Sequence, residues 1–217
     1  EILHDEIRAI ICPDKLTSKQ WIKIIETAHS VGLPTTSTMM FGHVERNFHV
    51  AQHLLKLLNL QQKTNGITEF VPLPFVADEA PIFRRGQARP GPTFKETILV
   101  HSVARILFQG QINNIQGSWV KMGLPGLKFL LSSGINDIGG VLMNESITRS
   151  AGASFGQELK LEEVIGIADE LELNLQQRNT LYDSLNNNLR DLITLQSIPL
   201  IPINNDYHKP KKLINIS

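Results

Sequence analysis

The feature that most constrains the fold is residues 35–45, a run rich in β-branched residues that passes directly into a helical pattern. The run Thr35–Phe41 ends at Gly42, and Glu45 is expected to open the next helix. A join of this kind places a bare glycine backbone and a helix N-terminus beside any ligand that binds there. The pattern predicts a strand that ends at a binding site, with an ordinary strand and turn as the alternative.

Short β-rich runs alternate with helical patterns along the rest of the chain. Because helices join parallel strands, this alternation predicts an α/β fold with a parallel sheet. The sheet is either doubly wound or part of a (β/α) barrel with outer helices. The expected strands are residues 35–41, 67–75, 112–119 and 135–143.

Polar capping residues mark the helix boundaries. Thr17 with Gln20, and Thr93 with Glu96, have the spacing of capping boxes, and apolar residues at helical spacing follow each box. Further helices are expected at residues 125–131 and 161–171. The helix after the first strand is expected to bury a stripe made of Phe48, Ala51, Leu55 and Leu58.

The number of strands is small for a closed barrel. A complete eight-stranded barrel takes roughly 250 residues, and about half of its units are expected here. Half a barrel would leave open strand edges, which natural proteins avoid. The sequence also begins at Glu1 without an initiator methionine. We therefore expect a processed chain or the C-terminal part of a longer gene product.

Composition excludes several classes of function. The 21 basic residues balance the 21 acidic ones, which does not favour nucleic-acid binding. No run of 18 apolar residues predicts a membrane span, and the acidic N-terminus does not resemble a secretory signal. Cys12 is the only cysteine, so no intrachain disulfide is possible. These observations predict a cytoplasmic protein.

Seven motifs occur in order along the chain: Leu3-x-Asp-Glu-x-Arg8, Ile11-Cys-Pro-Asp-Lys15, Thr35-Thr-x-Thr-Met-Met-x-Gly-His-Val-Glu45, Ala80-Pro-Ile-Phe83, Ala88-Arg-Pro-Gly-Pro-Thr93, Ser118-Trp-Val-Lys-Met-Gly123 and Met143-Asn-Glu-Ser-Ile-x-Arg-x-Ala-Gly-Ala153. Together they resemble the second subunit of FO synthase, a radical S-adenosylmethionine enzyme family. The resemblance runs from Glu1 to about residue 185 and implies that residues 1–185 are the C-terminal part of a (β/α) barrel. It does not cover residues 186–217, where Asn, Lys and Pro predict a loosely ordered tail.

The resemblance implies a transferase of deazaflavin biosynthesis. In this family a four-iron cluster cleaves S-adenosylmethionine, and the resulting radical oxidises L-tyrosine. The hydroxybenzyl fragment then adds to a ribitylamino-uracil. The implied cofactors are S-adenosylmethionine and a [4Fe–4S] cluster, and the implied partners are the two substrates and the other FO synthase subunit.

The resemblance also implies which residues form the cofactor site. The strand with Thr38, Met40, Gly42 and Glu45 would pack against the adenosine, with Met40 offering a soft apolar surface. Thr38 stands where the wider superfamily often has glycine, and Met40 stands where it often has isoleucine. Both departures fit the narrower subfamily.

Two segments are expected to contribute to the substrate site. Asn144, Glu145 and Arg149 follow the last expected strand, where Glu145 would accept a hydrogen bond from an amine and Arg149 would bind a carboxylate. A capped polar turn is the alternative. Gln116, Ser118 and Trp119 end the preceding strand. Trp119 would stack on a flat ring or serve as a buried structural residue.

The cluster cannot be held by this chain as it stands. The family's cluster needs a Cys-x-x-x-Cys-x-x-Cys loop, and Cys12 alone cannot supply it. The chain is therefore expected to be inactive alone. Two other readings remain open: a relative of the menaquinone pathway with the same barrel, and a non-catalytic binding module derived from the barrel.

Two polar features can each be interpreted structurally as well as functionally. A long loop is basic because it contains Arg84, Arg85 and Arg89. It is either a solvated loop or a lid that closes over anionic substrate groups. His49 and His53 have the helical spacing of zinc ligands, but no glutamate base lies between them, so no metal site is predicted.

Overall fold

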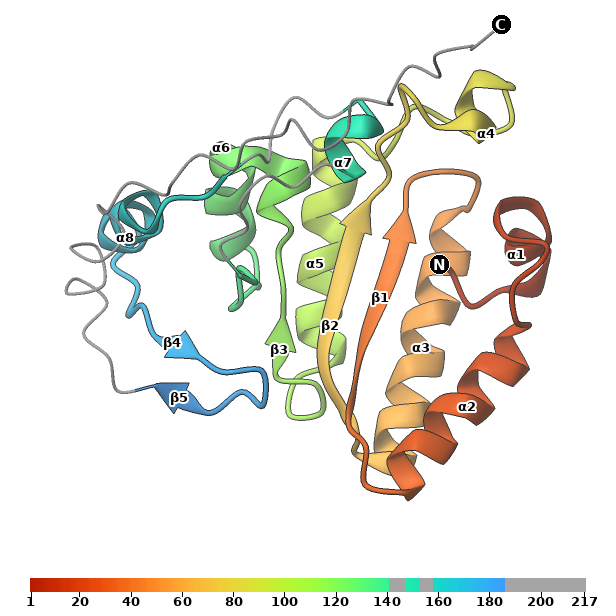
Figure 1. Ribbon diagram of the computed structural model, residues 1–217, viewed down its shortest axis with the longest axis horizontal. Helices are drawn as coiled ribbons and strands as arrows, with labels where there is room; N and C mark the ends of the chain where they lie inside the picture. The colour runs from red at the N-terminus through yellow and green to blue at the C-terminus, as the bar shows by residue number, and fades with distance from the viewer. Residues whose placement is uncertain (141–146, 153–157, 186–217) are drawn as a thin grey trace, which may run out of the picture. The chain divides into compact units, whose positions relative to one another are not determined.

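The computed structural model describes residues 1–140, 147–152 and 158–185 (Figure 1). The chain divides into two compact units, Glu1–Asn174 and Leu175–Ser217. In the second unit, β4 (Gln177–Arg178) and β5 (Ser184–Leu185) form an antiparallel pair. The expected tail, residues 186–217, lies outside the described residues, so the boundary at residue 185 stays a prediction.

The first unit contains a parallel sheet with the strand order β1-β2-β3. Its strands are β1 (Thr35–Phe41), β2 (Ile67–Pro74) and β3 (Asn114–Ile115). In the register, Thr38 lies beside Val71 and Met40 lies beside Leu73. The predicted α/β class and its parallel strands are confirmed.

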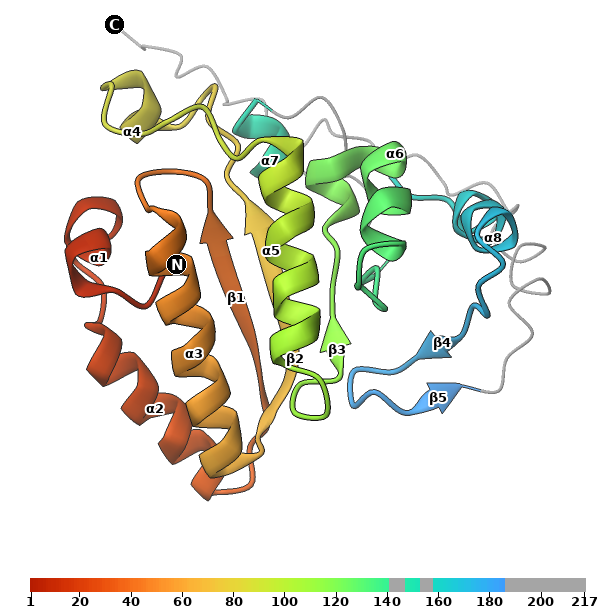
Figure 2. The same ribbon diagram turned by 180° about the vertical axis from the view of Figure 1, so that it is seen from behind.

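Helices cover one face of this sheet. Figure 2 shows α3 and α5 in front of the strands, whereas Figure 1 shows the strands from the opposite side. Both predicted capping boxes form, because the hydroxyls of Thr17 and Thr93 each accept a backbone hydrogen bond three residues later. The helices are α1 (Asp5–Ile11), α2 (Ser18–Ser30), α3 (Asn47–Thr64), α4 (Pro81–Arg84), α5 (Phe94–Leu107), α6 (Trp119–Leu131), α7 (Ile147–Ser150) and α8 (Leu161–Glu170).

The core of the first unit lies between the sheet and these helices. Along β1, Met39 and Phe41 are buried, whereas Thr36 and Thr38 are exposed, which is the period-two alternation of a strand with one covered face. Phe70 of β2 is fully buried and packs edge-on against Phe108. Burial of a side chain of this size contributes about 2–3 kcal/mol.

The predicted buried stripe of α3 is wrong. Phe48 is 51% exposed and Leu55 is 50% exposed, and Ala51 is also exposed. Four of the five leucines of this helix occur in adjacent pairs, so apolar spacing fits two neighbouring faces equally well. The face that packs on the sheet also carries two histidines, and its buried members are His49, His53, Leu54, Leu57, Leu60 and Gln61.

The third predicted strand is shorter than expected, and the described part of the fourth forms only an isolated bridge. Only Asn114 and Ile115 form β3, and Trp119 is already the first residue of α6. In place of a strand at residues 135–140, Asp137 makes a single parallel bridge to Gln116, and residues 141–143 lie outside the described ranges. A side chain supplements the backbone pairing here: the Asn136 Oδ1 atom accepts from the Ile115 amide at 3.0 Å, while the Gly117 amide donates to the Asp137 carbonyl at 2.9 Å.

The helix predicted at residues 125–131 begins earlier. α6 is two helical segments joined at Gly123, whose φ is 63°, and Pro125 follows this break. The helix predicted at residues 161–171 matches α8 (Leu161–Glu170). Within the described residues, no helix is both long and apolar enough to cross a membrane.

Candidate functional site

The candidate site begins at the carboxyl end of β1. Thr38 is exposed and Met40 is half-buried, and both lie on the face of β1 opposite the buried Met39 and Phe41. Figures 1 and 2 show α4 and α7 near the end toward which β1 and β2 point. In parallel β/α proteins ligands bind at this end of the strands.

Gly42 ends β1 with a φ of 97°, a conformation that strongly favours glycine. A Cβ atom built on this residue would lie 2.2 Å from Cδ of Pro92. The glycine therefore lets the loop before α5 approach the strand end closely. The space beside its α-carbon is filled by this loop.

Glu45 does not open the helix as predicted, because α3 begins at Asn47 with Arg46 as its N-cap. Its carboxylate turns back toward the strand end, and only 1% of the side chain is exposed. Oε1 accepts a hydrogen bond from the Gly42 amide at 2.5 Å, and Oε2 accepts one from the His43 amide at 3.0 Å. The carboxylate thus fixes the turn that follows β1.

The electrostatics of Glu45 keep this carboxylate ionised. Burial by itself would raise its pKa, but the hydrogen bond and charge of His43 and the amide of Gly42 outweigh burial and lower the pKa to about 2. The Nδ1 atom of His43 lies 2.9 Å from Oε2 of Glu45. The ionised carboxylate carries a negative charge, so it attracts a nearby cationic side chain.

Arg89 brings such a cation from the loop. Its Nη2 atom lies 3.5 Å from Oε1 of Glu45, and its Nη1 atom donates to both carboxylate oxygens of Glu96, at 2.8 and 3.0 Å. The Arg89 amide also donates to the His43 carbonyl at 3.0 Å. Arg84 pairs with Glu79 on the surface. Carboxylates therefore already neutralise two of the three arginines in this basic loop.

The loop between β2 and α5 is ordered by hydrogen bonds to segments distant in sequence. The Phe75 amide donates to the Phe41 carbonyl at 2.8 Å, beside the end of β1. The Glu79 amide donates to the Ala151 carbonyl at 3.1 Å, just after α7. The loop thus connects the end of β1 with the segment that contains α7.

The predicted substrate residues fall into two groups. Gln116 is half-buried beside Gly139, Ser118 is the N-cap of α6, and Trp119 is 4% exposed. The indole Nε1–H of Trp119 donates to the Gly140 carbonyl at 3.1 Å, which is the geometry of a buried structural tryptophan. Asn144 and Glu145 lie outside the described residues, and Arg149 belongs to α7 with no described side chain.

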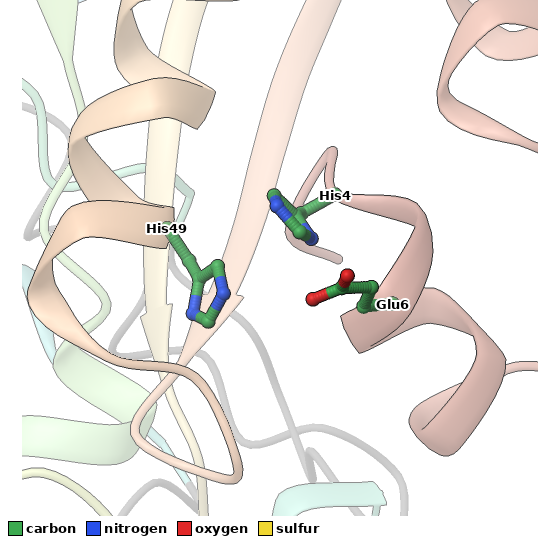
Figure 3. Close-up of side chains that lie close together, drawn as sticks. All are labelled: His4, Glu6 and His49. Atoms are coloured by element: carbon green, nitrogen blue, oxygen red, sulfur yellow. The ribbon is translucent and has the colours of Figure 1, made fainter.

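A cluster of possible metal ligands, missed by the sequence reasoning, lies on another part of the chain. Atoms of His4, Glu6 and His49 that can bind a metal lie within 4.8 Å of one another (Figure 3). The Nδ1 atom of His49 accepts a hydrogen bond from the Arg46 amide at 3.0 Å. The neutral ring then carries its proton on Nε2, and a protonated nitrogen cannot bind a metal. We therefore assign no metal to this cluster.

His49 and His53 have the sequence spacing of zinc ligands, but their rings make separate contacts and do not bind one metal ion together. His53 is buried, and its Nδ1 atom accepts a hydrogen bond from the Leu3 amide at 3.0 Å. His49 instead lies against His4, with ring centroids 4.5 Å apart. Both histidines of this helix therefore have structural contacts.

A parallel sheet with helices on one face, and with a polar turn and a hydrogen-bonded loop at its strand ends, defines a β/α protein, a class in which ligands bind at those ends. The chain belongs to the family described as the CofH/MqnC C-terminal region, whose model matches residues 64–189. This assignment confirms the family that the sequence motifs resemble.

Named relatives narrow the assignment. The chain is 48% identical over 182 residues to the 5-amino-6-(D-ribitylamino)uracil--L-tyrosine 4-hydroxyphenyl transferase of Methanothermobacter thermautotrophicus, covering 84% of this chain and 50% of the relative. The enzyme of that name from Methanocaldococcus jannaschii is also 48% identical, with 85% and 52% covered. The FO synthase of Mycobacterium leprae is 46% identical, with 84% and 21% covered. The chain thus spans about half the length of the transferases it matches.

The two cofactors implied by the family fit this chain unequally. A four-iron cluster takes cysteine thiolates as ligands, whereas Cys12 is the only cysteine of the chain and is buried at the end of α1. The residues of this chain therefore do not fit the cluster. The exposed side of β1 fits a nucleoside better, because Thr38 offers a hydroxyl and Met40 a polarisable surface.

Proposed function

We propose that this chain is the C-terminal part of a transferase of deazaflavin biosynthesis. The proposed reaction transfers the 4-hydroxybenzyl group of L-tyrosine to 5-amino-6-(D-ribitylamino)uracil, giving a condensation product that later steps convert to FO. The observation that carries this proposal is the 48% identity to a transferase of that name over 182 residues. At that level of identity over most of the chain, the substrate-facing segments of the two proteins are expected to match.

The proposed fold is part of a (β/α) barrel of the radical S-adenosylmethionine type. Support comes from the parallel order β1-β2-β3 and from the helices that cover only one face of these strands. In such a barrel the uncovered face of the strands is the interior, and the loops at the carboxyl ends form the mouth.

The proposed S-adenosylmethionine site uses β1 and the turn after it. Thr38 and Met40 would contact the adenosine directly, since both lie on the side of β1 away from the helices. Gly42 and Glu45 would contribute by setting the shape of the turn. The cluster that activates S-adenosylmethionine would need cysteines that this chain does not contain.

The proposed substrate site lies on the segments around α6 and α7. Arg149 would bind the carboxylate of tyrosine in a two-pronged contact, and Glu145 would accept a hydrogen bond from an amine or ring N–H. Asn144, Gln116 and Ser118 would add polar contacts. Trp119 would support this wall as a buried structural residue, because its side chain is almost fully covered and its indole N–H donates to the Gly140 carbonyl.

The relatives and the composition also suggest a protein partner and a cellular location. The other FO synthase subunit is the proposed protein partner, because the chain covers 21% of the FO synthase of Mycobacterium leprae but 50% of the separate transferase. The proposed location is the cytoplasm. Disulfides are rare in that reducing compartment, and a chain whose single cysteine is Cys12 cannot form one within itself.

Product analysis tests the proposal. The complete gene product, purified anaerobically with a reconstituted cluster, is incubated with S-adenosylmethionine, L-tyrosine and the ribitylamino-uracil. Mass spectrometry should detect the condensation product only when both substrates are present. Turnover of a menaquinone precursor in place of tyrosine would support the other branch of the family, and binding without turnover would support a non-catalytic module.

A further inference from the structure

We propose that Arg89 is a positioning residue that latches the loop at the mouth of the site onto the end of β1. The latch consists of Gly42, His43, Glu45, Arg89 and Glu96, and the mouth loop is residues 75–92. This inference deepens the proposed function and rests on it for its kinetic consequence. The structural part stands on contacts within the chain alone.

Glu45 is the fixed point of the latch. Both of its carboxylate oxygens accept backbone amides of the turn, and the buried side chain has almost no surface left for a ligand. A buried carboxylate of this kind is costly unless donors surround it. Its partners are therefore part of the folded turn, and its role is to hold the strand end in shape.

Arg89 is the bridge from this fixed point to the loop and to α5. Its backbone amide donates to the His43 carbonyl, while its guanidinium lies between the carboxylates of Glu45 and Glu96. Glu96 is itself held by the Thr93 amide at 2.6 Å in the capping box of α5. A planar guanidinium serves two carboxylates at once, which a lysine ammonium does less well.

The loop needs this bridge because it passes very close to the strand end. Pro92 occupies the space where Gly42 lacks a side chain. Gly91, with a φ of 103°, similarly allows the loop to cross the Phe75 carbonyl. Loss of Arg89 would remove the charge-assisted contacts that hold this crossing, next to the half-buried Met40 on the same strand end.

Hydrogen exchange of the complete gene product tests the structural claim. Arg89→Met removes the charge and keeps the length, and Arg84→Met is the matched control, because Arg84 is a neighbouring loop arginine paired with Glu79 on the surface. We expect Arg89→Met to speed amide exchange at residues 42–46 and 85–92 by about tenfold, through local opening. In Arg89→Met, the amides of β2 should exchange at the wild-type rate. In the control Arg84→Met, residues 42–46 should also exchange at the wild-type rate. Unchanged exchange at residues 42–46 in Arg89→Met, or an equal rise throughout the sheet, would overturn the latch.

Kinetics of the same variants test the functional consequence. Arg89→Met should raise the KM for S-adenosylmethionine about tenfold and leave the KM for tyrosine unchanged, because the loosened turn adjoins the proposed adenosine face. Arg89→Lys should recover part of this loss, and Arg84→Met should behave as wild type. A tenfold fall in kcat for Arg89→Met, with the KM values for S-adenosylmethionine and tyrosine both unchanged, would contradict a positioning role. If the wild-type gene product forms no condensation product, the proposed function fails, while the exchange experiment still decides the latch.

Discussion

The carboxylate of Glu45 lies 3.5 Å from the guanidinium of Arg89, across the turn that ends β1. Glu45 precedes α3, whereas Arg89 follows β2 and the short helix α4. This ion pair therefore joins segments that the chain order keeps apart. Together with the close contact of Gly42 and Pro92, it determines how the mouth loop lies on the strand end.

Replacement of Gly42 by alanine tests the close contact with Pro92. Gly42→Ala should lower the free energy of unfolding by about 3 kcal/mol, because the new methyl group meets Pro92 in a left-handed backbone conformation. Gly86→Ala is the control, since Gly86 also has positive φ but open space around it, and about 1 kcal/mol is expected there. Urea unfolding measures both. Equal losses would show that backbone conformation alone requires the glycine.

Two buried histidines predict a loss of stability in acid. Burial lowers the pKa of His53 to about 3, and burial lowers that of His101 to about 4 despite the raising effect of its bond to Thr97. The unfolded rings take up protons near pH 6.5, so stability is full above that pH and is lost as the pH falls toward these values. Each ring contributes about 1.4 kcal/mol per pH unit in its window.

The variant His101→Leu checks this assignment. It removes one titrating ring from the core, so the free energy of unfolding should fall less steeply between pH 6 and 4, about 1.4 kcal/mol less per unit. Urea titrations at several pH values measure the slope. A slope equal to that of the wild type would mean that His101 is not the neutral buried group described here.

The orientation of α3 is tested by two of its leucines. Leu57 is fully buried and Leu55 is half exposed. Leu57→Ala should cost about 3 kcal/mol of unfolding free energy through a core cavity, whereas Leu55→Ala should cost about 0.5 kcal/mol. Chemical denaturation of both variants gives the comparison. A larger loss at Leu55 would support the stripe expected from apolar spacing.

Substitutions of two neighbouring methionines in β1 distinguish an effect on cofactor binding from an effect on stability. Met40→Ala should weaken binding of S-adenosylmethionine to the complete gene product about fivefold, through lost contact with the adenine, with little change in stability. Met39 is fully buried on the other face, so Met39→Ala should cost about 3 kcal/mol of stability. Equilibrium dialysis and thermal unfolding distinguish the two. Unchanged binding by Met40→Ala would remove Met40 from the proposed site.

Features encoded by neighbouring residues were predictable from the sequence. The bounds of β1 follow from its β-branched run and Gly42, and both capping boxes follow from a hydroxyl and an acceptor three residues apart. The helix α8 follows from apolar residues at helical spacing. In these cases local geometry alone determines the structure.

Features that depend on tertiary contacts were not predictable. Glu45 was expected to begin a helix near a ligand, but its carboxylate turns back to the strand end, where Arg89 reaches it. Paired leucines concealed which face of α3 is buried. Trp119 was expected at a strand end, but α6 begins there, although the Ser118 side chain at its N-cap position makes no capping hydrogen bond. An arginine in a Pro- and Gly-rich loop was the only hint of the latch, and no local rule names its carboxylate partner.

We propose above all that the protein containing this chain transfers the 4-hydroxybenzyl side chain of tyrosine to a pyrimidine. Isotope tracing with the complete gene product and the ribitylamino-uracil tests it most directly. Tyrosine labelled with ¹³C in its ring and β-carbon should give a product that carries the whole label, and tyrosine labelled only in its carboxyl group should give an unlabelled product. A product without ring label, or label transfer from the carboxyl carbon, would contradict the account.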